Sequence, residues 1–176
     1  LELSDAAPRG TVHPGCEIVS IALAVAEQRG LGGRAILPAV VAGYEIEIRF
    51  GRALHPSAYY RGWSTPGLLG AIGPAVTSGH ILGLDAAGLD NAIGIALNLA
   101  PCATGRTSQA ATAKWLIGGH ACATGLVAAE MAARGVKGMR DVVTGWMPVL
   151  SDKWFPERLT EGIAPDARID PCRDQR

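Results

Sequence analysis

Four basic side chains in this sequence have surroundings that suit chemistry on a small anion: His13, Arg61, Arg106 and Lys114. His13 precedes Pro14, which biases the histidine to an extended backbone, so we expect its ring at the entrance to the helix that follows. Lys114 precedes a run of Gly, Ala, Cys and Thr residues that lets helix backbones approach closely. We therefore expect Lys114 at the mouth of a tightly packed helix, with a solvated surface charge as the alternative interpretation.

The two arginines lie in segments that we expect to be loops. Arg61 belongs to an aromatic, glycine-rich segment and Arg106 to a polar segment rich in hydrogen-bond donors. Such cations would bind the carboxylates of a small substrate, while His13 or Lys114, with a pKa shifted by burial or by neighbours, could move a proton at the adjacent carbon. The aromatic segment could instead be a plug over the core.

Other catalytic chemistries find little support in the motifs. Cys102 lacks the second cysteine of a deaminase zinc site, and His120 with Cys122 supplies only two possible ligands, so we expect no metal site. No glycine-rich segment has the spacing of a phosphate-binding loop. Ser64 could be written into a triad with a histidine and an aspartate, but no nucleophile-elbow motif surrounds it.

The composition indicates one unusually apolar domain. The 176 residues suit a single domain with a substantial core. Hydrophobic residues make up 48% and charged residues only 18%, below the share of about a quarter in an average soluble domain, so another surface should cover part of this one. The 16 acidic and 16 basic residues balance, which gives no bulk charge to attract nucleic acid or an anionic membrane.

The cysteines and the longest uncharged stretch bear on location. The four cysteines form no C-x-x-C pair and no charged-then-apolar leader precedes them, so we expect free thiols in a reducing cytoplasm. Residues 62–84 carry no Asp, Glu, Lys or Arg and are long enough to span a membrane. Two prolines and six glycines dilute that stretch, so a buried helix of a soluble protein is the better interpretation and a membrane-embedded protein the alternative.

Hydrophobic periodicity predicts an all-α fold, a compact bundle of about five to six helices with Gly/Ala-rich interfaces. We find no period-2 alternation that indicates a sheet and no internal repeat. The helical domain should cover residues 1–140 and be incomplete at its N-terminus, and residues 141–176 should form an irregular C-terminal tail. The expected helices span about 16–29, 34–54, 68–82, 86–99 and 118–134, with Asp85 as a possible N-cap.

The expected helix over residues 34–54 has a broad apolar face. Its charged residues should lie elsewhere around the helix, where they can pair with one another; they are Glu45, Glu47, Arg49 and Arg52.

A series of short motifs over about residues 10–138 resembles the MmgE/PrpD family. No single motif is specific, but their order and spacing are hard to obtain by accident. They are H-P-G at 13–15, G-R at 33–34, V-A-G-Y-E at 41–45, R-A-L at 52–54, R-G-W at 61–63, L-G-L-D at 82–85, and the lysine at 114 with the glycine at 119 before G-L-x-A-A at 125–129.

The resemblance implies a helical domain with a smaller α+β lid domain, in a homodimer that needs no metal or other cofactor. Family members such as 2-methylcitrate dehydratase, cis-aconitate decarboxylase and iminodisuccinate epimerase make or break bonds next to a carboxylate. A lyase or isomerase that acts on a small polycarboxylate is therefore implied, with dehydration as the family default. By this resemblance His13 is a candidate acid or base, and Lys114 a carboxylate anchor or proton donor.

Three departures from the family pattern define the rival hypothesis. Asp5 is the one carboxylate left where the family carries adjacent aspartates, although it remains a catalytic candidate. Ser64, a candidate substrate-binding residue with Arg61 and Arg106, stands where some members have a histidine. The sequence also ends soon after the helical domain, without the lid. The alternative is a truncated, non-catalytic helical module for dimerisation or ligand binding.

Overall fold

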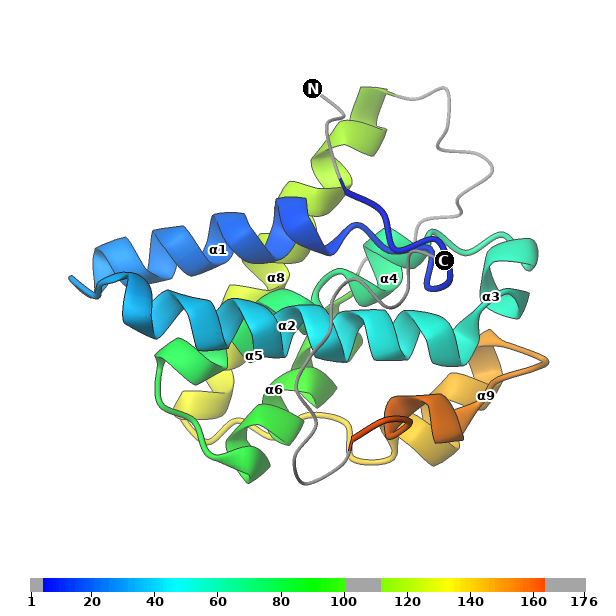
Figure 1. Cartoon of the computed structure of the whole chain (residues 1–176). Coiled ribbons are helices and arrows are strands. Elements are labelled where there is room, and N and C mark those ends of the chain that lie inside the picture. The colour runs from blue at the N-terminus through cyan, green and yellow to red at the C-terminus, as the bar shows by residue number, and fades with distance from the viewer. Residues whose placement is uncertain (1–4, 101–111, 164–176) are drawn as a thin grey trace.

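The computed structural model describes residues 5–100 and 112–163, which form an all-α bundle (Figure 1). This confirms the predicted fold class. The α-helices are α1 (Pro14–Gln28), α2 (Gly33–Leu54), α3 (Ser57–Tyr60), α4 (Thr65–Leu69), α5 (Ile72–Ile81), α6 (Ala86–Leu99), α8 (Ile117–Ala133) and α9 (Met147–Leu150). Shorter helical turns are η1 (Thr112–Leu116), η2 (Val142–Trp146) and η3 (Pro156–Leu159).

Local signals explain where several helices begin. Pro14 opens α1, where the missing N–H costs no intrahelical hydrogen bond. Asp85 is the N-cap of α6, as the sequence indicated, and its Oδ1 accepts a hydrogen bond from the Gly88 N–H at 2.8 Å. The helix expected over 68–82 is divided into α4 and α5. Pro74 explains the break, because it cannot donate a helical hydrogen bond to the carbonyl of Gly70.

Helix α5 is the centre of the bundle and packs against α1, α2, α6 and α8. Its residues 72–79 are all buried. The Gly/Ala-rich character of the interfaces permits this close packing. A Cβ atom on Gly125 of α8 would lie 2.5 Å from the Cβ of Pro74 and 2.7 Å from the carbonyl oxygen of Ala71. The two helices therefore approach as closely as a glycine allows.

The C-terminal part of the described chain is more ordered than the sequence indicated. Val142, Met147 and Leu150 are buried in the same hydrophobic cluster as Leu54, and the Phe155 N–H donates to the carbonyl of Ala53 at 2.8 Å. Residues 142–150 are helical, which differs from the irregular tail expected from residue 141. Turns of four or five residues are too short to show a hydrophobic period. Residues 164–176 lie outside the described part.

One stretch, Thr112–Ala133, is long and apolar enough to cross a membrane by length and composition alone. In the bundle α8 packs against α5, α6 and α1 and buries Ala121, Ala128 and Ala129. The uncharged stretch at 62–84 is largely buried as well, in α4 and α5. The stretch at 62–84 therefore has the packing of a core helix, whereas only 28% of the apolar window in Thr112–Ala133 is buried.

The glycine contact between α8 and α5 predicts a stability difference between two substitutions in one helix. Gly125→Ala should lower the free energy of unfolding by about 1–3 kcal/mol, because the added methyl group overlaps buried backbone atoms. Gly119→Ala is the matched control, since no atom lies within 4 Å of its added Cβ, and it should leave stability unchanged or slightly higher. Urea unfolding measures both, and equal stability of the two variants would contradict the packing described.

Candidate active site

A half-open cavity of about 1060 Å³ lies between the start of α1, the start of α4 and the junction of η1 with α8. Of the six residues expected to form the site, His13, Ser64 and Lys114 line it. They come from sequence positions about 50 residues apart, so the fold brings the predicted segments together. Cys16, Glu17 and Cys122 also contribute to its lining, together with apolar side chains and backbone.

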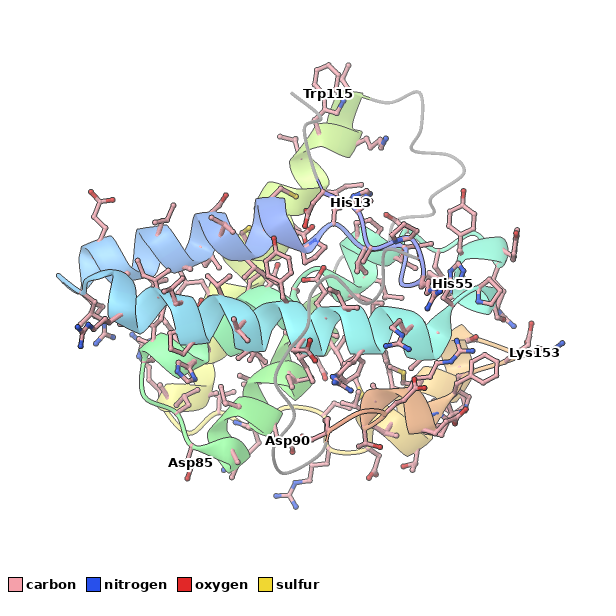
Figure 2. All side chains as sticks on the ribbon, in the orientation of Figure 1. His13, His55, Asp85, Asp90, Trp115 and Lys153 are labelled. Carbon is pink, nitrogen blue, oxygen red and sulfur yellow. The ribbon has the colours of Figure 1, made fainter. Side chains whose placement is uncertain are left out.

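His13 is the N-cap residue of α1 and is half-buried. Figure 2 shows His13 at the start of that helix. Its Nδ1 lies 2.7 Å from the carbonyl oxygen of Asp5. A carbonyl oxygen only accepts hydrogen bonds, so the proton in this contact belongs to Nδ1. In the neutral ring the lone pair is then on Nε2, which is the nitrogen available to take a proton.

The Asp5 side chain caps α1 and does not line the cavity. Its Oδ1 accepts from the Gly15 N–H at 2.8 Å, and its Oδ2 accepts from the Tyr44 hydroxyl at 3.2 Å. Burial, together with the nearby Asp5 charge, raises the pKa of Tyr44 to about 12. The Asp5 carbonyl therefore contacts His13, while the Asp5 side chain contacts Gly15 and Tyr44 instead of the cavity.

The substrate-binding predictions have different outcomes. Ser64 is buried in the cavity wall at the N-cap of α4. Arg61 does not line the cavity: its guanidinium forms an ion pair with Asp152. Because Asp152 follows the apolar turn of α9, this pairing could not be read from the sequence around Arg61. Arg106 lies outside the described residues.

Lys114 is exposed at the rim of the cavity, which corrects the expectation of a sheltered position. It belongs to η1, a turn that precedes the packed part of α8. Trp115 and Leu116 in the same turn are 67% and 71% exposed. Figure 2 shows Trp115 at the tip of this projecting segment. Lys114 can therefore reach the cavity only from its outer edge.

The sequence analysis missed two buried carboxyl groups, Glu17 of α1, which lines the cavity, and Glu47 of α2, which does not. Their exposed fractions are 1% and 0%. Among the described residues, Glu17 Oε2 and both Glu47 carboxyl oxygens have no hydrogen-bond partner other than the two carboxyls themselves, which hydrogen-bond each other when one is protonated. A Cβ on Gly70 would lie 2.6 Å from Glu17 Oε2, and one on Gly73 would overlap Glu47 Oε2. The carboxyls thus occupy the space that two glycines leave open.

Burial raises the pKa of both carboxyls. The Glu47 carboxyl is the next largest cause for Glu17, and Asp5 raises both further. Two adjacent buried carboxylates cannot both ionise at neutral pH. The pair therefore retains at least one proton. The sequence signal for this burial was the position of each glutamate within an apolar run. Glu47 was wrongly expected on the polar side of its helix.

The two thiols in the cavity are poor nucleophiles. Burial, with the nearby Glu17, raises the pKa of Cys16 to about 11 and that of Cys122 to about 12, so both stay protonated at neutral pH. Within residues 5–100 and 112–163, no group of three or more His, Cys, Asp or Glu side chains converges as a metal site would require.

Comparison with known sequence families gives a match over most of the chain. A family model described as the MmgE/PrpD N-terminal domain matches residues 1–157. The matched range includes the His13 loop, the Glu17–Glu47 pair and the Lys114 turn, and it continues beyond residue 140. No curated protein sequence matches the chain significantly.

The buried carboxyl pair predicts that stability falls as pH rises. A carboxyl whose pKa is raised in the folded chain keeps a proton that the unfolded chain loses above about pH 4.5. For each carboxyl that keeps its proton in the folded chain, the free energy of unfolding falls by up to about 1.4 kcal/mol for every unit by which the pH rises. The double variant Glu17→Gln/Glu47→Gln should therefore lose less stability than the wild type between about pH 5.5 and 7.5. In this range the carboxyls of the unfolded chain are ionised, while the raised pKa values keep protons on the folded chain.

Urea unfolding across that window measures the slope. The matched control is Glu27→Gln/Glu45→Gln, which removes two glutamates from the same helices outside the cavity wall. Burial lowers the pKa of His55 and gives a slope of opposite sign, but this contribution is common to all the variants. Equal slopes in the wild type and the Glu17/Glu47 variant would contradict the raised pKa values.

Proposed function

Because the chain belongs to the MmgE/PrpD family, we propose that it is a lyase or isomerase that acts on a small polycarboxylate by proton transfer next to a carboxylate. The observation that carries this proposal is the hydrogen bond from His13 Nδ1 to the Asp5 carbonyl. It leaves Nε2 as a base in a cavity that Lys114 also lines. Dehydration is the narrower proposal within this reaction class.

The side chains divide the work by their chemistry. The Lys114 ammonium at the rim attracts a substrate carboxylate. A carbon next to a carboxylate then lies near His13, whose Nε2 takes its proton while the electrons move toward that carboxylate. The buried Ser64 hydroxyl is a further hydrogen-bond group for the substrate. None of these roles needs a cofactor.

We also propose that the chain works as a homodimer. Helices α1 and α8 expose apolar side chains that a monomer would leave in water: Val19, Leu23, Val127 and Met131 are 40%, 54%, 40% and 37% exposed. A subunit interface is the usual reason for several exposed apolar residues on neighbouring helices.

The base role of His13 predicts the loss of proton exchange on its substitution. Proton NMR in deuterated buffer, with citrate, 2-methylcitrate, cis-aconitate and aspartate-derived diacids, should show loss of a substrate C–H signal or a new alkene signal. His13→Asn should slow this change by at least about 100-fold, the usual contribution of a positioned general base. His120→Asn is the matched control, since His120 is exposed on α8 away from the cavity lining.

The same assay separates Lys114 from His13. Lys114→Ala should raise KM more than it lowers kcat, because an ammonium at the rim contributes mainly to binding. Lys137→Ala, which removes a lysine outside the cavity, is its control. Binding of these acids by the folded wild type without any exchange would contradict the proposed reaction and favour a non-catalytic, ligand-binding module.

A further inference from the structure

The wall of the cavity contains an acid that the proposed reaction leaves unused, the carboxyl of Glu17. It lies one helical turn after His13, so both side chains project from the same face at the start of α1. Both line the cavity. Glu17 is 1% exposed, and among the described residues its carboxyl has no side-chain partner other than the Glu47 carboxyl for its Oε2.

The surroundings of this carboxyl supply no compensating cation. The groups that act on it electrostatically are Glu47, from α2, and Asp5, from the loop before α1, and both are acidic. The thiol of Cys16 on α1 and that of Cys122 on α8 also face it, since Glu17 raises the pKa of each. An ionised Glu17 would therefore be a buried, unpaired charge, whose cost far exceeds that of keeping the proton.

Glu17 is also close to the surface that a ligand would touch. The Cβ position on Gly118, another residue of the cavity wall, lies 3.6 Å from Glu17 Oε1. Gly118 has no side chain, so only its hydrogen atom lies between the backbone at the start of α8 and the Glu17 carboxyl. On the other side, Gly70 and Gly73 leave the space that Glu17 and Glu47 fill.

A polycarboxylate in the cavity would bring more negative charge toward this group. An ionised Glu17 would repel it, whereas a protonated Glu17 can donate an O–H hydrogen bond to a carboxylate oxygen. Hydrogen bonds of this type, between an O–H donor and an anion, are among the stronger ones in proteins. The neutral form is therefore the one compatible with the ligand.

We propose that Glu17 is a specificity-determining residue that donates a hydrogen bond, as a neutral carboxylic acid, to one carboxylate of the bound polycarboxylate. This inference rests on the ligand class of the proposed function and does not depend on turnover. Glu47 acts as a positioning residue: its carboxyl hydrogen-bonds that of Glu17, and the proton that Glu47 retains fills this bond and leaves the Glu17 O–H for the ligand. No bond to carbon forms or breaks in this role.

Calorimetric binding of citrate and of tricarballylate tests the proposal; tricarballylate lacks the hydroxyl group that a dehydration would remove. Glu17→Met removes the donor at similar volume, and it should weaken binding at least about 10-fold, the usual effect of losing a hydrogen bond to a charged group. Glu17→Gln keeps a neutral donor, so it should bind within about threefold of the wild type. Glu27→Met makes the same change on the exposed side of α1 and should bind like the wild type.

Each outcome decides the matter. Wild-type affinity in Glu17→Met, or equal weakening in Glu17→Met and Glu17→Gln, would overturn the neutral-donor role, and so would a folded wild type that binds neither acid. Binding with the expected order of variants but without turnover would leave this inference standing while the proposed reaction fails. Should Glu17→Met not fold, infrared difference spectra of the wild type decide: citrate should shift a protonated carboxyl C=O band that is absent in Glu17→Gln, and an unchanged band would overturn the proposal.

Discussion

The close packing of helices on α5 is the constraint on which the rest of the structure depends. Because Gly125 has no side chain, α8 can lie directly against the backbone around Pro74. Gly70 and Gly73 leave room for two carboxyl groups. Side chains of ordinary size at these positions would separate the helices by the width of a methyl group or more. The cavity would then lose its wall, because α1 and α8 both contribute to it and both lie against α5. Small residues thus determine the distance between the elements that hold His13 and Lys114.

The reactive groups of the proposed site lie at the start of α1. Asp5 satisfies the Gly15 N–H with its side chain and His13 Nδ1 with its carbonyl, so one residue fixes both the helix end and the orientation of the imidazole. One turn later, the Glu17 side chain is buried with Glu47 beside it. The same short segment therefore presents a base and a neutral acid to one cavity. A polycarboxylate needs groups of both kinds, since one of its carbons loses a proton while its carboxylates require donors.

The sequence predicted what depends on local pattern. Helical periodicity, the Asp85 cap and the family resemblance led to the all-α fold, and the H-P-G segment led to His13. Features that depend on contacts between distant segments could not be predicted from the sequence. Arg61 pairs with Asp152 of the C-terminal turns, Lys114 is exposed because η1 projects from the bundle, and Glu47 is buried because its helix packs glutamate against Gly73. A charged residue within an apolar run reveals nothing about its partner until the helices are assembled.

The most direct test of this account is the tautomer of His13, measured by long-range proton–nitrogen correlation NMR on the nitrogen-15-labelled chain at neutral pH. The structure predicts that neutral His13 carries its proton on Nδ1, held by the Asp5 carbonyl, with an unprotonated Nε2. A ring protonated on Nε2 alone would contradict the account, because the nitrogen assigned as the base would then have no lone pair to accept a proton.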